Sequence, residues 1–190
     1  MARIPYPDPA ALPESDRKFL ETLPQLNISR LLAGSPSMFQ PLTRVFSAYL
    51  NDGQLDPELR EIVILRVANF FRSEYELFNH KRAALVIGMD QARIDALAGD
   101  LPESLFSEAE RQITQFVDEV LQDGAASEAT FRAVQQYLST AELIELSVVI
   151  GVYTMVAQIC ATFELEPEEV PIAATGMEDI GRAVKGLSNI

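Results

Sequence analysis

Apolar residues recur at intervals of three and four along most of the chain, which places them on one face of an α-helix. The segment Pro36–Leu50 illustrates this spacing with Met38, Leu42, Val45 and Tyr49. No segment shows the strict alternation of apolar and polar residues that is typical of a half-buried strand. No internal repeat is visible. The pattern therefore predicts an all-α protein.

Capping signals set the ends of the predicted helices. Asp56 is a natural N-cap, Pro57 suits the first helical position, and Glu58 lies in the first turn. Ser107 and Glu110 have the spacing of a capping box. The predicted helices are Ser15–Leu23, a short helical or turn segment Asn27–Ser35, Pro36–Leu50, Asp56–Phe71, Ser73–Ile87, Asp90–Leu97, Ser107–Gln122, Ser127–Leu138 and Thr140–Phe163.

The two ends of the chain lack this periodicity. Residues 1–13 contain four prolines, which remove backbone donors and favour an extended arm. Residues 166–190 are interrupted by proline and glycine, with at most a short helix near Asp179–Lys185. Because 190 residues suffice for one substantial core, we expect a single domain over 1–190 with an N-terminal arm and an irregular C-terminal tail.

The segment Leu143–Phe163 is nearly long and apolar enough to span a bilayer. It contains Glu145 and Gln158, and no basic residues flank it to set a membrane topology. We therefore expect a central helix that is buried by its own fold or by a neighbouring subunit.

Charge and cysteine content narrow the class of protein. The net charge of −13 argues against binding to nucleic acid or to anionic membranes, since both need basic patches. The single cysteine, Cys160, excludes an intrachain disulfide and any CxxC motif. The N-terminal residues carry no apolar signal segment. We expect a cytoplasmic protein with a small-molecule substrate, and neither a cofactor nor a metal.

The densest candidate chemistry surrounds His80, the one histidine of the chain. On a helix, Glu76 lies four residues before His80 and shares its face. Glu61 precedes the apolar run Ile62–Leu65, so its carboxylate is expected to be part-buried and partnered by His80. A carboxylate beside an imidazole fixes its tautomer and supports general acid–base chemistry. We therefore select His80, Glu61 and Glu76 as candidate catalytic residues.

A purely structural interpretation fits some of the same residues. Ser73 and Glu76 have the spacing of a capping box, which needs no catalysis. Tyr75 and Phe78 are aromatic residues of the kind that more often fill a core than contact a substrate. At this point Glu76 is either a helix cap or a proton carrier, and Ser73 and Tyr75 are candidate substrate contacts.

The window Leu55–Gly88 resembles the carboxymuconolactone decarboxylase family, which includes alkyl hydroperoxidase D-like proteins. The resemblance rests on LREIVILRVA at 59–68, SEYELFNH at 73–80, Ala84 and Gly88, and on the later segments FSEAER at 106–111 and ELIEL at 142–146 with Gly151 and Tyr153. It extends over roughly residues 36–163 and implies an orthogonal, multi-helical fold. The family pattern of a glutamate, a histidine and a glycine falls on Glu61, His80 and Gly88.

The resemblance has one clear departure. Hydroperoxidase members carry a CxxC pair before the histidine, and those positions are Ser73 and Glu76 here. Thiol-based peroxide reduction needs a thiolate and a resolving partner, so this chemistry is not expected. The resemblance then implies a lyase-like enzyme that performs cofactor-free proton transfer or decarboxylation on a small carboxylated lactone or ring.

Two alternatives to this function stay open. One is a peroxiredoxin-type antioxidant protein, as the family label suggests. The other is a non-catalytic binding or assembly protein on the same fold. The resemblance also implies a homo-oligomer, as a trimer, a dimer or a hexamer.

Overall fold

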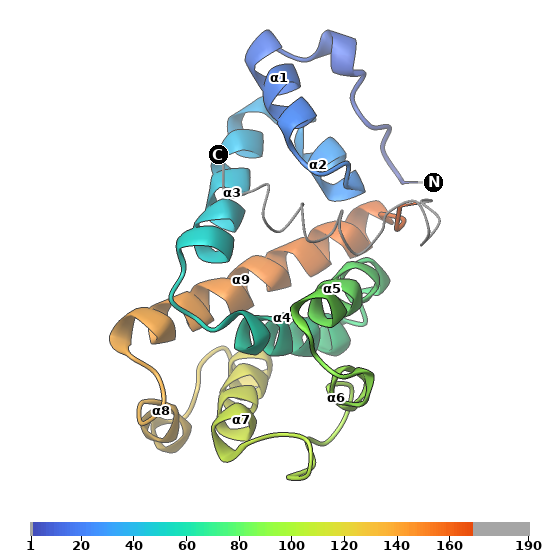
Figure 1. The fold of residues 1–190 in the computed structure, drawn as a ribbon. Coiled ribbons are helices and arrows are strands. Elements are labelled where there is room, and N and C mark those ends of the chain that lie inside the picture. Colours follow the sequence, from blue (N-terminus) through green and yellow to red (C-terminus); the bar gives the residue numbers. More distant parts are fainter. Residues whose placement is uncertain (1, 169–190) are drawn as a thin grey trace. The chain divides into compact units, whose positions relative to one another are not determined.

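The computed structural model describes residues 2–168 (Figure 1). All regular elements among these residues are helices, which confirms the predicted all-α class. The predicted helix near Asp179–Lys185 lies outside the described residues. The chain divides into two compact units, 1–53 with 159–190 and 54–158, and the division falls within the last helix. Each unit is described separately.

Before α9 (Thr140–Phe163), the first unit contains three short α-helices, one turn of 3₁₀-helix and one turn of π-helix. Its elements are the 3₁₀-helix η1 (Pro9–Ala11), α1 (Glu14–Thr22), α2 (Asn27–Leu32), α3 (Pro36–Ser47) and the π-helical turn η2 (Ala48–Asp52). The rings of Phe19 and Phe39 meet edge to face with centroids 5.4 Å apart. The backbone N–H of Arg3 donates to the carbonyl of Phe163. This contact holds the N-terminal arm against the end of the last helix.

Two predictions for this unit need correction. The arm is not extended throughout. The Asp8 carboxylate accepts a hydrogen bond from the Ala10 N–H and caps the start of the 3₁₀-helix η1. The third helix ends at Ser47 rather than Leu50, and the chain continues in the wider turn η2, which buries Tyr49.

The second unit holds the candidate chemistry. Its elements are α4 (Pro57–Phe71), α5 (Glu74–Ile87), α6 (Gln91–Ala96), α7 (Glu108–Asp123), α8 (Glu128–Val134) and most of α9 (Thr140–Phe163) (Figure 1). The predicted bounds of α9 are confirmed. The eighth helix is shorter than predicted, because Gln136 and Tyr137 donate to carbonyls three residues back and tighten the chain into turns.

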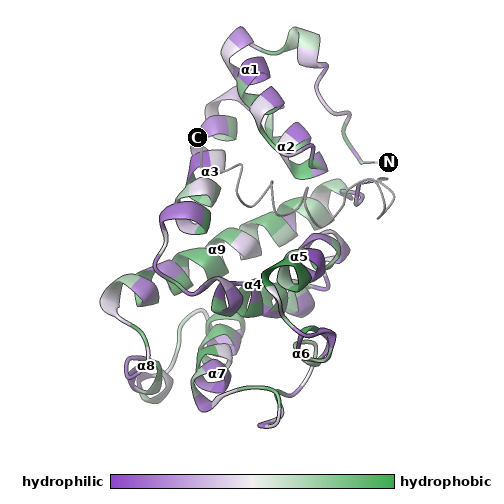
Figure 2. Ribbon diagram, in the orientation of Figure 1, coloured by the Kyte–Doolittle hydropathy of each residue, from purple (hydrophilic) through white to green (hydrophobic). Residues whose placement is uncertain are grey.

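Helix α4 is the centre of this unit. It packs against α5 and α7, and eight of its fifteen residues are buried on all sides of the helix. Figure 2 shows α4 as predominantly hydrophobic. Ile62 and Leu65 join a cluster with residues of α5, α6 and the following loops, which are Ala84, Met89, Ile94, Leu97 and Phe106. A helix that is apolar all round must be covered all round, so α4 supplies the rigid wall on which a site can be built.

The junction between α4 and α5 is a Schellman motif. Arg72 adopts the left-handed conformation at φ 52°, and Ser73 N–H donates to Ala68 O over 2.9 Å. A capping box at Ser73 would need this same N–H for the Glu76 carboxylate. The Ser73 side chain also makes no capping hydrogen bond. The capping-box interpretation of Ser73 and Glu76 is therefore wrong, because the Ser73 N–H is donated to Ala68 O at the end of α4 and is not available to the Glu76 carboxylate.

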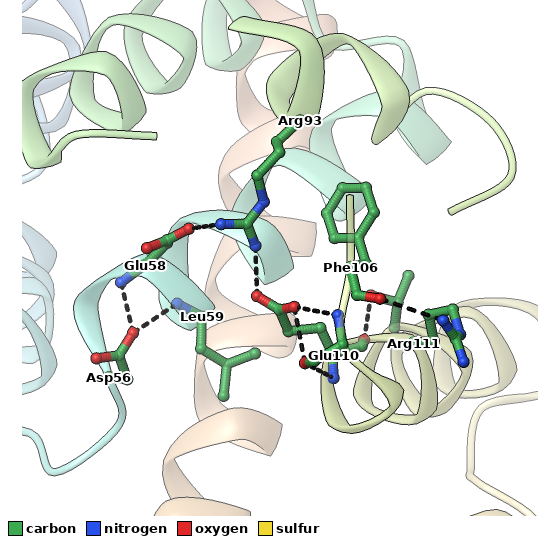
Figure 3. A network of polar contacts seen from close by, with 9 residues as sticks. Asp56, Glu58, Leu59, Arg93, Phe106, Glu110 and Arg111 are labelled. Carbon is green, nitrogen blue, oxygen red and sulfur yellow. Dashed lines mark hydrogen bonds and ion pairs between the residues drawn. The ribbon is translucent and has the colours of Figure 1, made fainter. Parts of the chain in front are cut away.

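Part-buried ion pairs connect other helices of the unit. Figure 3 shows Arg93 on α6 between Glu58 in the first turn of α4 and Glu110 in the first turn of α7. Glu110 also accepts the Ser107 N–H, which completes the capping box predicted for α7. A single guanidinium thus joins the N-termini of two helices, where carboxylates are favoured by the helix dipole.

Helix α9 is long and apolar enough to cross a membrane by length and composition alone, and 39% of its most apolar window is buried. The core helix of a soluble protein passes the same test. Glu145 on α9 accepts the backbone N–H groups of Gln54 and Leu55, at 2.7 and 2.8 Å. Ile144 and Val148 on α9 are exposed. Exposed apolar side chains of this kind suit a subunit interface, and the homo-oligomer stays a prediction.

Arg66 offers a test of the packing around α4. Its guanidinium pairs with both Asp118 oxygens and donates to two backbone carbonyls, at side-chain exposures of 21% for Arg66 and 26% for Asp118. Arg66→Met leaves a half-buried carboxylate without its partner, so we expect a loss of about 2 kcal/mol in unfolding free energy. Urea denaturation measures this loss. The matched control is Arg132→Met, whose pair with Glu128 is 72% exposed at both side chains, and a loss above about 0.5 kcal/mol there would contradict the reasoning.

Two serines test the correction at the start of α5. Ser107 caps α7 through its side chain, whereas Ser73 makes no such bond at α5. We expect Ser107→Ala to lower the unfolding free energy by about 1 kcal/mol and Ser73→Ala to change it by less than about 0.5 kcal/mol. Denaturation of the two variants side by side measures both values, and equal losses would restore the capping-box interpretation.

Candidate active site

The centre of the site is a hydrogen bond between α5 and α4. His80 Nδ1 lies 2.8 Å from Glu61 Oε2, as the sequence predicts. Glu61 is 3% exposed on the apolar helix α4, while the His80 side chain keeps an exposure of 18%. Because a carboxylate can only accept, the proton of the neutral imidazole lies on Nδ1, and Nε2 is left as the basic nitrogen. The dyad therefore presents one defined nitrogen for proton transfer.

The charges around His80 favour its protonated form. Burial alone would lower the pKa of His80, but the charge and hydrogen bond of Glu61, together with the charge of Glu76, raise this pKa above its ordinary value. The nearby charge of Arg60 opposes the increase. His80 is therefore an imidazole that holds its proton more tightly than a histidine in water.

Glu76 occupies the turn of α5 before His80 and is 2% exposed. Burial raises the pKa of Glu76 from 4.5 to about 7, with His80 lowering it and Glu61 raising it further. Its Oε2 atom is buried and makes no hydrogen bond within the described residues. Glu76 therefore gains or loses its proton near neutral pH, and its role as a proton carrier stays a prediction.

The two candidate substrate contacts differ in their surroundings. Ser73 is buried, and its Oγ has no hydrogen-bond partner among the described residues. Tyr75 is 4% exposed and belongs to the core. The structure brings Glu61, His80 and Glu76 into electrostatic contact. The catalytic and binding roles of these residues stay predictions.

Sequence reasoning missed the aromatic wall of the site. The Tyr153 ring of α9 meets the His80 ring edge to face, with centroids 4.8 Å apart and planes at 88°. This packing restrains rotation of the imidazole, as the Glu61 hydrogen bond does. His80 and Tyr153 are 73 residues apart in the sequence, so no local pattern indicates their contact. Tyr153 does lie in one of the segments that carried the family resemblance. Within residues 2–168 no group of three or more His, Cys, Asp or Glu side chains is placed to hold a metal ion.

Glu76→Gln tests the ionisation of the site. Since the pKa of Glu76 is raised in the folded protein to about 7, the wild type binds this proton more tightly than the unfolded chain does. Its contribution to stability is complete below about pH 4.5 and declines as the pH rises towards and through 7. The pKa of His80 is raised as well, so its contribution has the same sign at higher pH.

The glutamine variant has no proton to lose. We expect the unfolding free energy of the wild type, relative to Glu76→Gln, to fall by about 3 kcal/mol between pH 4 and pH 8. Urea denaturation over this pH range measures the difference. Glu74→Gln, the same change at an exposed residue of the same turn, is the control. Parallel pH profiles for wild type and Glu76→Gln would show that Glu76 titrates as an ordinary carboxylate.

Solved structures with this fold come from proteins of low sequence identity. A peroxidase-related protein from Ralstonia eutropha JMP134, described as an alkylhydroperoxidase AhpD core, is 19% identical with a TM-score of 0.76, over 88% of this chain and 93% of that chain. A peroxidase-related protein from Silicibacter sp. TM1040 is 16% identical with a TM-score of 0.76, over 88% and 92%. The debrominase Bmp8 is 18% identical with a TM-score of 0.70, over 89% and 95%. At this identity they show the fold alone.

The sequence itself matches a family. No curated protein is detectably similar to the chain. Residues 36–119 match the carboxymuconolactone decarboxylase family, and this segment contains α4, α5 and the Glu61–His80 pair. The chain is therefore similar to the carboxymuconolactone decarboxylase family over residues 36–119, and its single cysteine means that it has no CxxC pair.

Proposed function

We propose that this protein is a lyase-like enzyme that moves protons on a small carboxylated lactone or ring, with decarboxylation as one outcome. The observation that carries the proposal is the 2.8 Å contact between His80 Nδ1 and Glu61 Oε2. It leaves Nε2 of a partly exposed imidazole as a base in its neutral form and as an acid in its charged form. The family, whose name is that of a decarboxylase, includes enzymes.

Each carboxylate has a separate role in this proposal. Glu61 is a positioning residue, because it holds the imidazole by Nδ1 and stabilises the imidazolium that forms when Nε2 takes a proton. Glu76 carries a second proton one helical turn away, and its raised pKa of about 7 suits exchange at neutral pH. Side chains alone supply the acid, the base and the orienting group.

A second candidate is the thiol redox chemistry that the family label and the peroxidase-related neighbours suggest. Ser73 and Glu76 occupy the positions of the two cysteines, and neither side chain forms a thiolate or a disulfide. Cys160 lies on α9 and is 4% exposed. A buried thiol on another helix does not supply the pair that this chemistry needs. The observations favour proton transfer over redox chemistry.

Deuterium uptake and carbon dioxide release test the proposed reaction. The protein is incubated in D₂O with a panel of small carboxylated lactones and ring acids, and products are followed by proton NMR. We expect turnover that falls by about 100-fold or more in His80→Asn, since the amide keeps a donor for Glu61 but has no atom at the position of Nε2. Glu61→Gln should lose about tenfold, because the imidazole then loses its fixed tautomer.

Glu74→Gln is the control for these variants and should react like the wild type, since Glu74 is exposed. Equal turnover of His80→Asn and wild type would overturn the assignment of His80. Absence of turnover on the whole panel would favour the third alternative, a non-catalytic binding or assembly protein on this fold.

Peroxide consumption with a dithiol reductant tests the redox alternative. We expect no sustained consumption by the wild type, because the chain has one cysteine and no partner thiol for it to resolve against. Cys160→Ser is the matched variant. Turnover that is present in the wild type and lost in Cys160→Ser would establish thiol chemistry and remove the basis of the lyase proposal.

A further inference from the structure

Two buried polar atoms in the first turn of α5 are not used by the fold. Ser73 Oγ and Glu76 Oε2 are buried without a hydrogen-bond partner among the described residues, in side chains that belong to residues only 7% and 2% exposed. Buried polar groups in native proteins are nearly always paired, and each exception calls for an explanation such as a catalytic role or a bound water or ion. Ser73 is the N-cap residue of α5 and Glu76 lies in the first turn, so both belong to the same end of the helix.

The local sequence explains why these atoms are unpaired. In α7, the equivalent residues Ser107 and Glu110 satisfy each other's backbone N–H groups. In α5, the Ser73 N–H is already donated to Ala68 O at the end of α4. The Ser73 hydroxyl makes no capping bond either. The first N–H groups of α5 thus lack a side-chain cap from this serine, and they add to the positive potential of the helix N-terminus.

We infer that Ser73 and Glu76 form the subsite for a carbonyl oxygen of the substrate, which makes the substrate a small carbonyl compound whose oxygen gains negative charge during the reaction. This inference rests on the proposed function and specifies where the electrons go. A protonated carboxyl group and a hydroxyl group both donate hydrogen bonds, and such donors in a buried site stabilise a developing oxyanion. A helix N-terminus favours the same charge.

The electron flow balances without a further reactant. A carbon next to the carbonyl group gives its proton to His80 Nε2, and the electrons of the broken C–H bond form a C=C bond as the carbonyl π pair moves onto oxygen. That oxygen accepts hydrogen bonds from Ser73 and Glu76 as an enolate. Return of the proton from Nε2 to carbon restores the carbonyl group. When the broken bond is C–COO⁻ instead, carbon dioxide leaves and protonated His80 supplies the proton to carbon.

Charged or titratable groups act on Glu76 directly or on its neighbour His80. Glu61 and Arg60 belong to α4, His80 belongs to α5, and Tyr153 belongs to α9 and contacts His80. Glu61 repels an anion, whereas Arg60 and protonated His80 attract one. A pH effect on anion binding can therefore arise from His80 as well as from Glu76, and the test has to separate the two.

Acetate is a suitable probe, because its oxygens resemble an oxyanion and it undergoes no reaction. The chain has one histidine, so the imidazole ¹⁵N signals belong to His80 alone and report acetate binding without assignment. In the wild type, we expect acetate affinity to fall with rising pH as Glu76 loses its proton, by up to about tenfold per pH unit above its pKa. Ser73→Ala should bind acetate at least about fivefold more weakly at low pH, as expected for the loss of one hydrogen bond.

Glu76→Gln separates the two titrating groups. Its amide still donates but never ionises, so acetate binding should persist through neutral pH and fall only where the His80 signals show loss of the imidazolium proton. Glu74→Gln should behave like the wild type. A pH profile of Glu76→Gln identical to that of the wild type, full affinity in Ser73→Ala, or no saturable acetate binding in the wild type would each overturn the inference. Acetate binding requires no turnover, so this test can fail while deuterium uptake succeeds, and the reverse.

Discussion

The site depends on one buried charge that α4 cannot accommodate alone. Glu61 lies among buried apolar residues on a helix that is covered on all sides, and an unpaired carboxylate there would be strongly disfavoured. The hydrogen bond from His80 supplies the compensation. The requirement that buries Glu61 thus also fixes the position, the tautomer and the protonation preference of the only histidine. In the Glu61–His80 pair, the hydrogen bond that compensates a buried charge is also the contact that orients the imidazole.

The junction of α4 and α5 adds a second constraint. Because Arg72 turns the chain through the left-handed conformation, the Ser73 N–H closes the end of α4 and is not available to α5. Glu76 therefore keeps a buried oxygen that the helix does not use. A residue pattern that stabilises a helix start elsewhere in the chain leaves two buried polar atoms here without a hydrogen-bond partner among the described residues. The difference between Ser73 and Ser107 lies in the residues before them and not in the capping pattern itself.

The sequence predicts the helices well where local signals determine them. Asp56 and Pro57 start α4 as expected, and the apolar pattern of Thr140–Phe163 gives both ends of α9. The contact of Glu61 with His80 is also predictable, since a carboxylate beside an apolar run needs a buried partner. Contacts between distant segments, such as Arg93 with Glu58 and His80 with Tyr153, have no spacing that reveals them. The π-helical turn that buries Tyr49 likewise depends on packing, and no periodicity indicates it.

The surroundings of His80 and Glu76 raise the pKa of both groups, but for different physical reasons. Glu61 accepts a hydrogen bond from His80 Nδ1–H, and this contact raises the pKa of the imidazole. Glu76 has no such donor, so burial raises its pKa to about 7 instead. Near neutral pH, the carboxyl group of Glu76 thus alternates between donor and acceptor, one helical turn from the imidazole. Proton-transfer catalysis requires surroundings that adjust the proton affinity of individual side chains, and for Glu76 burial makes this adjustment.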